Sequence, residues 1–282
     1  MENSIEIRGL KYNYPKFSLE GIDLDIPCGT VMGLIGENGA GKSTLIKAVL
    51  GLIKPSGGSV KVFGEEAVNL SAEAREQIGV VFDELPFPKG LNSKQLDKVL
   101  GGIFKSWDSD KFFGYLSRFG LPINKKLGSF SRGMQMRLSI AAAMSHAPKL
   151  LVLDEPTGGL DPVIRSEILD LLLEFMQDES HSILISTHIT SDLEHIADYI
   201  GFIHSGRLVF SEDRNELKER HRILKCTEEQ LAKIDRADII GMRSGRYSHE
   251  VLTTAFEKYP DIAQEVPSID ELMVYYVKDE VV

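Results

Sequence analysis

The chain has 282 residues, of which 43% are hydrophobic, so it is long enough for one large domain with a hydrophobic core and a small appendage. Its 42 acidic residues outnumber its 32 basic residues, and the resulting net charge of -10 disfavours nucleic acid as a partner. The two cysteines, Cys28 and Cys226, lack metal-binding or redox spacing, which indicates a reducing compartment, and no apolar run approaches the ~18–20 residues that span a bilayer, so we expect membrane contact only through a partner.

The first two predicted strands lie near the N-terminus. Residues 5–10 and 19–26 alternate apolar and polar side chains, as half-buried strands do, and we expect the two to pair antiparallel. Tyr12 and Tyr14 lie between them. Either ring could stack on an adenine, although packing of each ring on the core is about equally expected.

A glycine-rich stretch follows the third predicted strand. Residues 36–44 read GENGAGKST, after the apolar run 30–35 and before the helix-like segment 45–50. In this G-x-x-x-x-G-K-S pattern, backbone N–H groups surround a phosphate at a helix N-terminus, the lysine adds charge at the β- and γ-phosphates, and the serine can bind Mg²⁺. The pattern therefore predicts a nucleoside triphosphate site. Its candidate residues are Asn38, Gly39, Ala40, Gly41, Lys42, Ser43 and Thr44.

The next predicted strand, 78–82, ends at Asp83, and the pattern of apolar residues then changes. Residues 85–127 show helical spacing with glycine and proline breaks and no strand pattern, which predicts an all-helical insertion. Its aromatic residues are expected to form a helical core and not a ligand site. A long helix then runs to about residue 146, and Ser131 is placed to cap its N-terminus.

Two acidic residues end the next buried strand. Residues 150–153 are all apolar, and Asp154 and Glu155 follow them. A strand beside the phosphate-binding loop can deliver an aspartate to Mg²⁺, and the following Glu155 is the candidate general base for a water in line with the γ-phosphate. A further buried strand, 182–187, ends at His188, where a γ-phosphate contact is favoured because ligands bind at the carboxyl ends of parallel strands.

In this order and at this spacing, the motifs resemble those of the ATP-binding subunits of ABC transporters, and specifically the stand-alone ATPases of bacterial ABC-2-type exporters. The resemblance covers about residues 5–211. It rests on GENGAGKST, the signature FSRGMQMRL, LLVLDEP, GGLD and STHI. It implies an α/β fold: a P-loop NTPase core with an antiparallel β subdomain, an all-helical insertion subdomain at about 85–146, and a small C-terminal α/β extension.

The resemblance also implies cofactors, a partner and residue roles. ATP with Mg²⁺ would be held by one subunit and capped by the signature of a second ATPase subunit, identical or a paralogue, that closes head to tail. The implied roles are adenine stacking for Tyr14, capping of the partner's nucleotide for Ser131 and Gly133, communication across the interface for Asp161, metal binding for Ser43, Asp83 and Asp154, and catalysis for Lys42, Glu155 and His188.

Two positions depart from the usual pattern of this family. Asp83 stands where a glutamine that contacts Mg²⁺ is usual, and we hypothesise that Asp83 is a metal ligand. Arg132 stands where a glycine is common in the signature, and Met134 where a glutamine is common. Arg132 could reach a nucleotide or an acidic residue of a partner; an exposed arginine without a special task is equally compatible with the sequence.

The resulting interpretation divides the chain into an ATPase domain, 1–211, and an extension, 212–282, that is regulatory, dimer-supporting or simply a packing extension. The ATPase would power export through separate transmembrane subunits at the cytoplasmic face of the membrane, with the insertion as docking surface. Peptide, antimicrobial, lipid and drug cargoes are all compatible. The alternative is a soluble ABC-type ATPase that acts on nucleic acid or ribosomes; a kinase or GTPase would require neither the signature nor His188.

Overall fold

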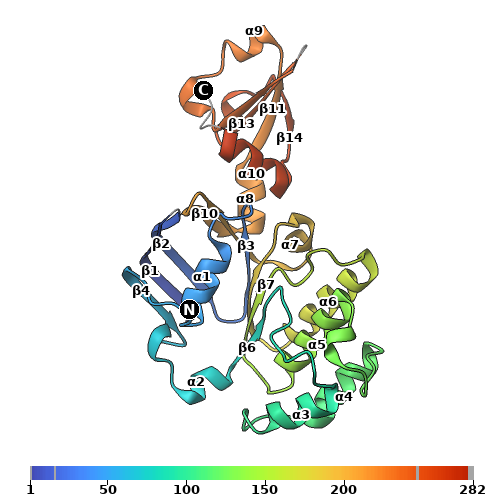
Figure 1. Cartoon of the computed structure of the whole chain (residues 1–282). Helices are drawn as coiled ribbons and strands as arrows, with labels where there is room; N and C mark the ends of the chain where they lie inside the picture. Colours follow the sequence, from blue (N-terminus) through green and yellow to red (C-terminus); the bar gives the residue numbers. More distant parts are fainter. Residues whose placement is uncertain (1, 16, 246–247, 279–282) are drawn as a thin grey trace.

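The computed structural model describes residues 2–15, 17–245 and 248–278, so small parts of both predicted domains, including 279–282, lie outside the described residues. In the described part, the strands form a central six-stranded sheet and two smaller antiparallel sheets (Figure 1). The central sheet has the spatial order β10 (Arg207–Asp213), β9 (Tyr199–His204), β3 (Val31–Ile35), β8 (Ser182–Ser186), β7 (Leu150–Asp154) and β6 (Ile78–Val81). All its neighbours pair in parallel except β10, which is antiparallel to β9.

The N-terminal sheet is antiparallel, as the alternating pattern predicts. Its order is β2 (Phe17–Pro27), β1 (Asn3–Tyr14), β4 (Gly57–Val62) and β5 (Glu65–Glu66). The predicted strands at 5–10 and 19–26 lie within β1 and β2 and pair antiparallel, which confirms that prediction.

Seven α-helices precede residue 200 in the described chain. They are α1 (Lys42–Val49), α2 (Ala72–Glu76), α3 (Ser93–Gly101), α4 (Ser109–Arg118), α5 (Arg132–Met144), α6 (Pro162–Phe175) and α7 (Thr190–Ile196). Residues 85–127, all of which the structure describes, contain α3 and α4 and form no strand beyond one isolated bridge between Asn92 and Lys126. The predicted helical character of this segment is therefore confirmed. Ser131 caps α5: its hydroxyl accepts a hydrogen bond from the Met134 N–H at 3.3 Å.

The central sheet is buried on both faces, which explains why its strands read as continuous apolar runs. Along β7, Leu150 and Val152 pack in the cluster that contains α1 and the N-terminal sheet. Leu151 and Leu153 point to the other face and pack in the cluster that contains α5, α6 and α7. Figure 1 shows the same arrangement, with α1 on one side of the sheet and these three helices on the other. Because the strands run parallel, the loops after β3, β6, β7 and β8 meet at one edge.

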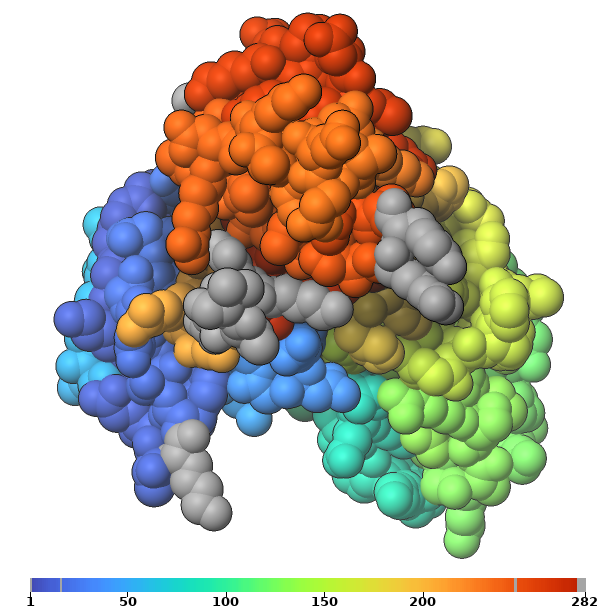
Figure 2. Space-filling model, turned by 90° about the horizontal axis from the view of Figure 1, so that it is seen from above, coloured from blue at the N-terminus to red at the C-terminus, as the bar shows by residue number. Residues whose placement is uncertain are grey.

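The C-terminal part forms a third layer that packs on this core. It comprises α8 (Arg214–Arg220), β11 (Arg222–Cys226), α9 (Glu228–Leu231), β12 (Gly241–Ser244), β13 (His249–Thr253), β14 (Ala263–Glu265) and α10 (Ile269–Lys278), with the sheet order β12-β13-β11-β14. Helices and strands both occur in this part, in agreement with the small α/β extension that the resemblance implies. Viewed from above, this part covers the middle of the molecule (Figure 2).

α10 joins the C-terminal sheet to the main core. Ile269, Leu272 and Tyr275 are fully buried and belong to the same hydrophobic cluster as Phe202 and Phe210 of the central sheet. The Phe210 and Tyr276 rings lie 5.4 Å apart. The C-terminal part therefore shares the core of the main unit.

Two buried histidines predict how stability depends on pH. Burial lowers the pKa of His221 and of His146 from the ordinary value of 6.5. The neutral His221 ring bonds the Leu217 carbonyl and the Tyr276 hydroxyl, both at 2.8 Å. Below about pH 6.5 the unfolded chain binds protons that the folded chain does not, so the free energy of unfolding falls as the pH decreases.

We expect the melting temperature to drop between pH 7.5 and pH 5.5, and the drop to be smaller for His221→Gln, which has no ring to protonate. Equal drops in the two proteins would show that His221 does not contribute to the pH dependence.

Among the residues that the structure describes, no helix combines the length and the apolar character needed to cross a membrane.

Candidate functional site

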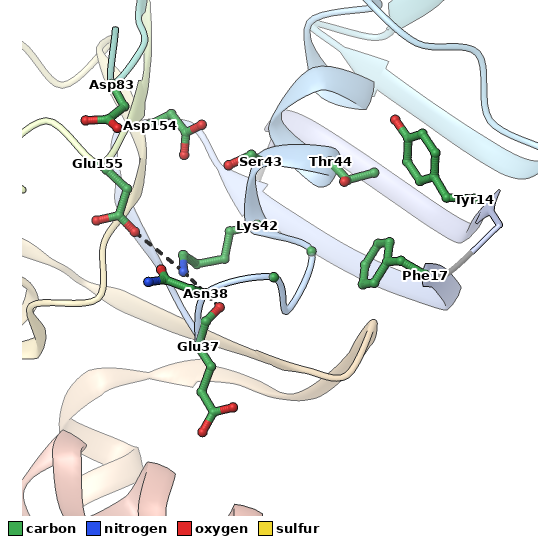
Figure 3. A pocket seen from close by; sticks show the side chains of 12 residues that line it. Tyr14, Phe17, Glu37, Asn38, Lys42, Ser43, Thr44, Asp83, Asp154 and Glu155 are labelled. Carbon is green, nitrogen blue, oxygen red and sulfur yellow. Dashed lines mark hydrogen bonds and ion pairs between the residues drawn. The ribbon is translucent and has the colours of Figure 1, made fainter.

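A cavity of about 550 Å³ opens at the edge where the parallel strands of the central sheet end. The loop between β3 and α1 forms one wall, and the chain after β6 and β7 forms another. The third wall comes from the ends of β1 and β2 (Figure 3). The cavity is lined by Tyr14, Phe17, Glu37, Asn38, Gly39, Gly41, Lys42, Ser43, Thr44, Asp83, Asp154 and Glu155.

The β3–α1 loop needs glycine because its backbone is left-handed and closely surrounded. Gly39 and Gly41 have φ of 85° and 120°, in the region that favours glycine. A Cβ on Gly41 would lie 2.6 Å from Leu19 and 2.8 Å from Phe17 of β2. The loop therefore lies directly against the N-terminal sheet, and the first turn of α1 points its N–H groups toward the cavity, where an anion is stabilised.

Lys42 supplies a buried positive charge at this helix N-terminus. Its ammonium donates to the Gly36 carbonyl at 2.7 Å and to the Glu37 carbonyl at 3.3 Å, and it lies 3.5 Å from Oε1 of Glu155. Only 6% of the side chain is exposed. A buried ammonium held by carbonyl oxygens at the floor of an open cavity is placed to attract phosphate oxygens.

Asp154 and Glu155 end β7 in two different environments. Asp154 is buried, and its Oδ1 accepts a hydrogen bond from the Ser186 hydroxyl of β8 at 2.5 Å. Glu155 has a positive φ of 52°, which turns its side chain away from the strand. Its backbone N–H donates to the Ser186 carbonyl at 3.0 Å. The neighbouring strand thus fixes the carboxylate of Asp154 and the backbone of Glu155.

His188 lies beside Glu155 and not on the cavity wall. Its Nδ1 is 2.6 Å from Oε2 of Glu155, and its backbone N–H donates to the same oxygen at 3.3 Å. About half of the His188 side chain is exposed, so the ring can reach a ligand that extends out of the cavity. Glu155 thus lies between the Lys42 ammonium and the His188 ring.

The donor set suits a hard cation with few protein ligands. The Ser43 hydroxyl and the Asp83 and Asp154 carboxylates line one cavity and offer oxygen atoms, which Mg²⁺ prefers. Within the described residues, no group of three or more His, Cys, Asp or Glu side chains is arranged to hold a metal ion by itself. Mg²⁺ commonly binds through one or two carboxylates together with phosphates and water, so the residues present fit this ion.

Several residues that the sequence singles out lie away from the cavity. Ser131 and Gly133 are at the start of α5, where a Cβ on Gly133 would lie 2.8 Å from Ile164 of α6. Asp161 caps α6, and its carboxylate accepts from the Val163 and Ile164 N–H groups. Ala40 is buried, and its N–H donates to the Glu37 carbonyl at 3.1 Å, so it presents no free donor.

The structure adds residues that the sequence interpretation missed. Phe17 lines the cavity beside Tyr14, and Figure 3 shows both rings on the same wall. Tyr12 lies behind Tyr14, with their ring centroids 4.5 Å apart, and does not line the cavity. Glu37 lines the cavity as well. Glu37 occupies a position of the glycine-rich motif at which any residue is allowed, so the sequence gave no signal for it. Phe17 is an aromatic residue at the start of β2, and this position could have suggested a ring near the cavity.

A buried polar cluster lies behind the site. Asp192 of α7 is fully buried, accepts from the Thr157 hydroxyl at 2.6 Å and pairs with Arg165 of α6. Arg165 also donates to the Ser191 hydroxyl at 2.6 Å. These contacts join the turn after Glu155 to the helices that follow Asp161 and His188.

Comparison with known proteins agrees with this geometry. The family model for the ABC transporter matches residues 19–158. The bacitracin transport ATP-binding protein BcrA of Bacillus licheniformis is 36% identical over 228 residues, which are 79% of this chain and 73% of that protein. The lantibiotic transport ATP-binding protein SrtF of Streptococcus pyogenes is 38% identical over 212 residues, which are 74% of this chain and 90% of that protein.

A solved structure is also similar. The structure of cbiO1 from Clostridium perfringens, part of the ABC transporter complex cbiONQ, has a TM-score of 0.64 and 29% identity and covers 77% of this chain and 91% of that one. The sequence relatives and the site together identify this chain as a member of the ABC transporter family, an ATP-binding subunit that hydrolyses ATP.

Proposed function

We propose that this subunit powers export across the cytoplasmic membrane through separate transmembrane subunits, with a peptide, antimicrobial or drug as cargo. The observation that carries this proposal is the cavity in which the Lys42 ammonium and the Asp154 and Glu155 carboxylates meet. The class of cargo rests on the two sequence relatives, which are named for transport of bacitracin and of a lantibiotic. The alternative, an ATPase that acts on nucleic acid or ribosomes, receives no support from a net charge of -10.

Within the cavity, the proposed roles follow from position. Lys42 and the N–H groups of the β3–α1 loop bind the β- and γ-phosphates, and the Tyr14 ring stacks on the adenine. Ser43, Asp154 and Asp83 would hold Mg²⁺, which, when bound, would supply positive charge that stabilises the phosphate oxygens. Glu155 accepts a proton from the attacking water, and His188, bonded to Glu155, orients that carboxylate and contacts the γ-phosphate.

The distant residues complete the site only in a pair of subunits. ATP-binding subunits of this family form dimers, and we propose a head-to-tail pair in which Ser131, Gly133 and the N-terminus of α5 of one subunit cap the nucleotide of the other. Two observations support this: these residues are absent from the lining of their own cavity, and Ser131 lies exposed at the N-terminus of α5, the end of a helix that stabilises a phosphate. Asp161, at the start of α6, would lie at the same interface.

An apolar groove supports docking to a transmembrane partner, as proposed for the helical insertion. Two adjoining cavities of about 310 and 280 Å³ share the lining residues Ile78, Val80, Phe82 and Phe104. Leu52 and Ile103, which line their rims, are exposed by 60% and 63%. An exposed apolar groove of this kind suits the apolar face of a partner's helix. Phe82, which lines the groove, directly precedes Asp83, so a docked helix would contact the chain that leads into the nucleotide cavity.

The domain boundary near residue 211 also remains a proposal. β10 continues to Asp213, and α8 begins at the next residue, so the extension starts without a linker. We propose that residues 212–282 act mainly as a packing extension of the core, because α10 packs in the cluster that contains Phe210.

The proposed pairing predicts that Glu155→Gln is a monomer with ADP and a dimer with ATP and Mg²⁺, measured by light scattering. The substitution keeps the size of the side chain but removes the proton acceptor, so ATP should persist between the subunits. Lys42→Ala in the same background is the control and should remain monomeric. A Glu155→Gln protein that stays monomeric with ATP would contradict a pair of identical subunits that closes on ATP alone.

A further inference from the structure

The two positions at which the sequence departs from the usual motifs contact each other. Arg132, the first residue of α5, donates from its guanidinium to Oδ1 of Asp83, which follows β6. The two residues are 49 positions apart in the chain. Both side chains are about half exposed, so packing alone does not dictate the contact.

Asp83 brings this contact to the nucleotide cavity. It lines the cavity together with Asp154 and Glu155, and Figure 3 shows the Asp83 and Asp154 carboxylates on the same wall. Glu155 has Lys42 and His188 as neighbours, and Asp154 has the Ser186 hydroxyl. Arg132 is the cationic partner of the third carboxylate. Its guanidinium is outside the cavity lining, so it approaches Asp83 from the outer side.

Arg132 also lies against the turn that follows Glu155. A Cβ on Gly158 would be 3.7 Å from a guanidinium nitrogen of Arg132, and a Cβ on Gly159 would be 3.5 Å from its central carbon. Gly159 has a φ of 69°, a conformation that few other residues adopt. The guanidinium therefore packs between the start of α5, the chain after β6 and the turn that leads to Asp161.

We propose that Arg132 is a positioning residue that shares the Asp83 carboxylate with Mg²⁺ and thereby couples metal–nucleotide binding to the start of the same subunit's signature helix. A cation that draws on Asp83 from inside the cavity competes with the guanidinium outside it, because both are attracted to the same negative charge. When Mg²⁺ engages Asp83, Arg132 is released and the first turn of α5 loses one of its attachments.

The coupling would link the two cavities of a dimer, and in this respect it rests on the proposed function. In a head-to-tail pair the start of α5 caps the partner's nucleotide. Occupation of one cavity by metal and nucleotide would then free the capping surface that the other cavity needs. The expected result is cooperation between the two sites that depends on Mg²⁺.

The test uses ADP, because ADP binding requires neither hydrolysis nor a second subunit. Calorimetry gives the Kd of ADP with and without Mg²⁺, and the ratio of the two values measures how much the metal tightens binding. We expect Arg132→Gln to increase this ratio about two- to fivefold, the range of an exposed ion pair. Arg132→Lys, which keeps the charge, should stay close to wild type.

Two controls assign the effect to Asp83. Arg118 forms an exposed pair with Glu174 far from the cavity, so Arg118→Gln removes the same charge and should leave the ratio unchanged. In an Asp83→Asn background, Arg132→Gln should cause no further change. A shift of equal size in that background, or with Arg118→Gln, would overturn the proposal. Absence of ADP binding by the wild type both with and without Mg²⁺ would instead contradict the proposed nucleotide site itself.

Hydrogen exchange tests the response of α5 separately. In the wild type, Mg²⁺ added to the ADP complex should speed exchange in the first turn of α5, since the attachment through Arg132 is released. In Arg132→Gln, exchange there should already be fast and should not respond to Mg²⁺. A wild-type first turn that does not respond to Mg²⁺ would show that the metal and Arg132 do not share Asp83.

Discussion

Replacing Lys42 with alanine is expected to reduce ATP hydrolysis by about 10²–10³-fold, the loss typical of removing one preorganised electrostatic contact from an active site. The ammonium is almost fully buried and has a fixed position, held by the Gly36 and Glu37 carbonyls. Its loss removes the charge that the phosphates meet and leaves Oε1 of Glu155 without its cation. The rate of ATP hydrolysis at saturating nucleotide should fall, and the Kd of ATP should rise.

Lys47 provides the matched control for this experiment. It lies on the same helix, α1, but is exposed and does not line the cavity. Lys47→Ala should therefore hydrolyse ATP within about twofold of the wild type, since exposed substitutions away from a site change little. If Lys42→Ala were as active as Lys47→Ala, the assignment of the cavity as the hydrolytic site would be wrong.

Replacing Arg165 with methionine is expected to destabilise the fold by about 3–5 kcal/mol, because it leaves the Asp192 carboxylate buried without a counter-charge. Asp192 is fully buried, whereas Arg165 remains partly exposed, so the aspartate bears most of the cost. Methionine keeps the length and the apolar contacts of the arginine stem. The decrease should appear as a lower midpoint of urea unfolding.

Two further variants separate charge from packing. Asp192→Asn combined with Arg165→Met should recover part of the lost stability, since the uncompensated charge is gone and the Thr157 hydroxyl keeps a partner. Arg118→Met breaks an exposed pair with Glu174 and should cost at most about 1 kcal/mol. Similar losses for Arg118→Met and Arg165→Met would contradict the importance of burial at Asp192.

The sequence predicted those parts of the site that are local in the chain. The phosphate-binding residues of the loop at 36–44, the strand before it and the helix after it all lie within about twenty residues. The position of the loop between β3 and α1 could therefore be predicted directly. The same holds for Asp154 and Glu155, which end a visibly apolar strand. Helix caps such as Ser131 are similarly local, because the cap and the N–H that it accepts from are three residues apart.

The parts that the sequence did not predict depend on contacts between distant segments. Both Asp83 and Arg132 were recognised as unusual, but only the folded chain shows that they form a pair. Asp192 has no motif of its own, and its partners Thr157 and Arg165 are 35 and 27 residues away. Phe17 reaches the cavity because β2 pairs beside β1. The alternation of apolar and polar residues predicts that these strands pair, but it does not predict which end of the pair lies against the glycine-rich loop.

The shared core at α10 has a consequence for how the protein is made. Of the elements described, α10 leaves the ribosome last, yet Ile269, Leu272 and Tyr275 complete the cluster that also holds Phe202 and Phe210. A nascent chain that has already displayed every nucleotide-binding motif still exposes an apolar surface beside β9 and β10. A premature stop after residue 213 would therefore preserve every motif of the ATPase and still produce an aggregation-prone protein, because translation must reach α10 before that core can close.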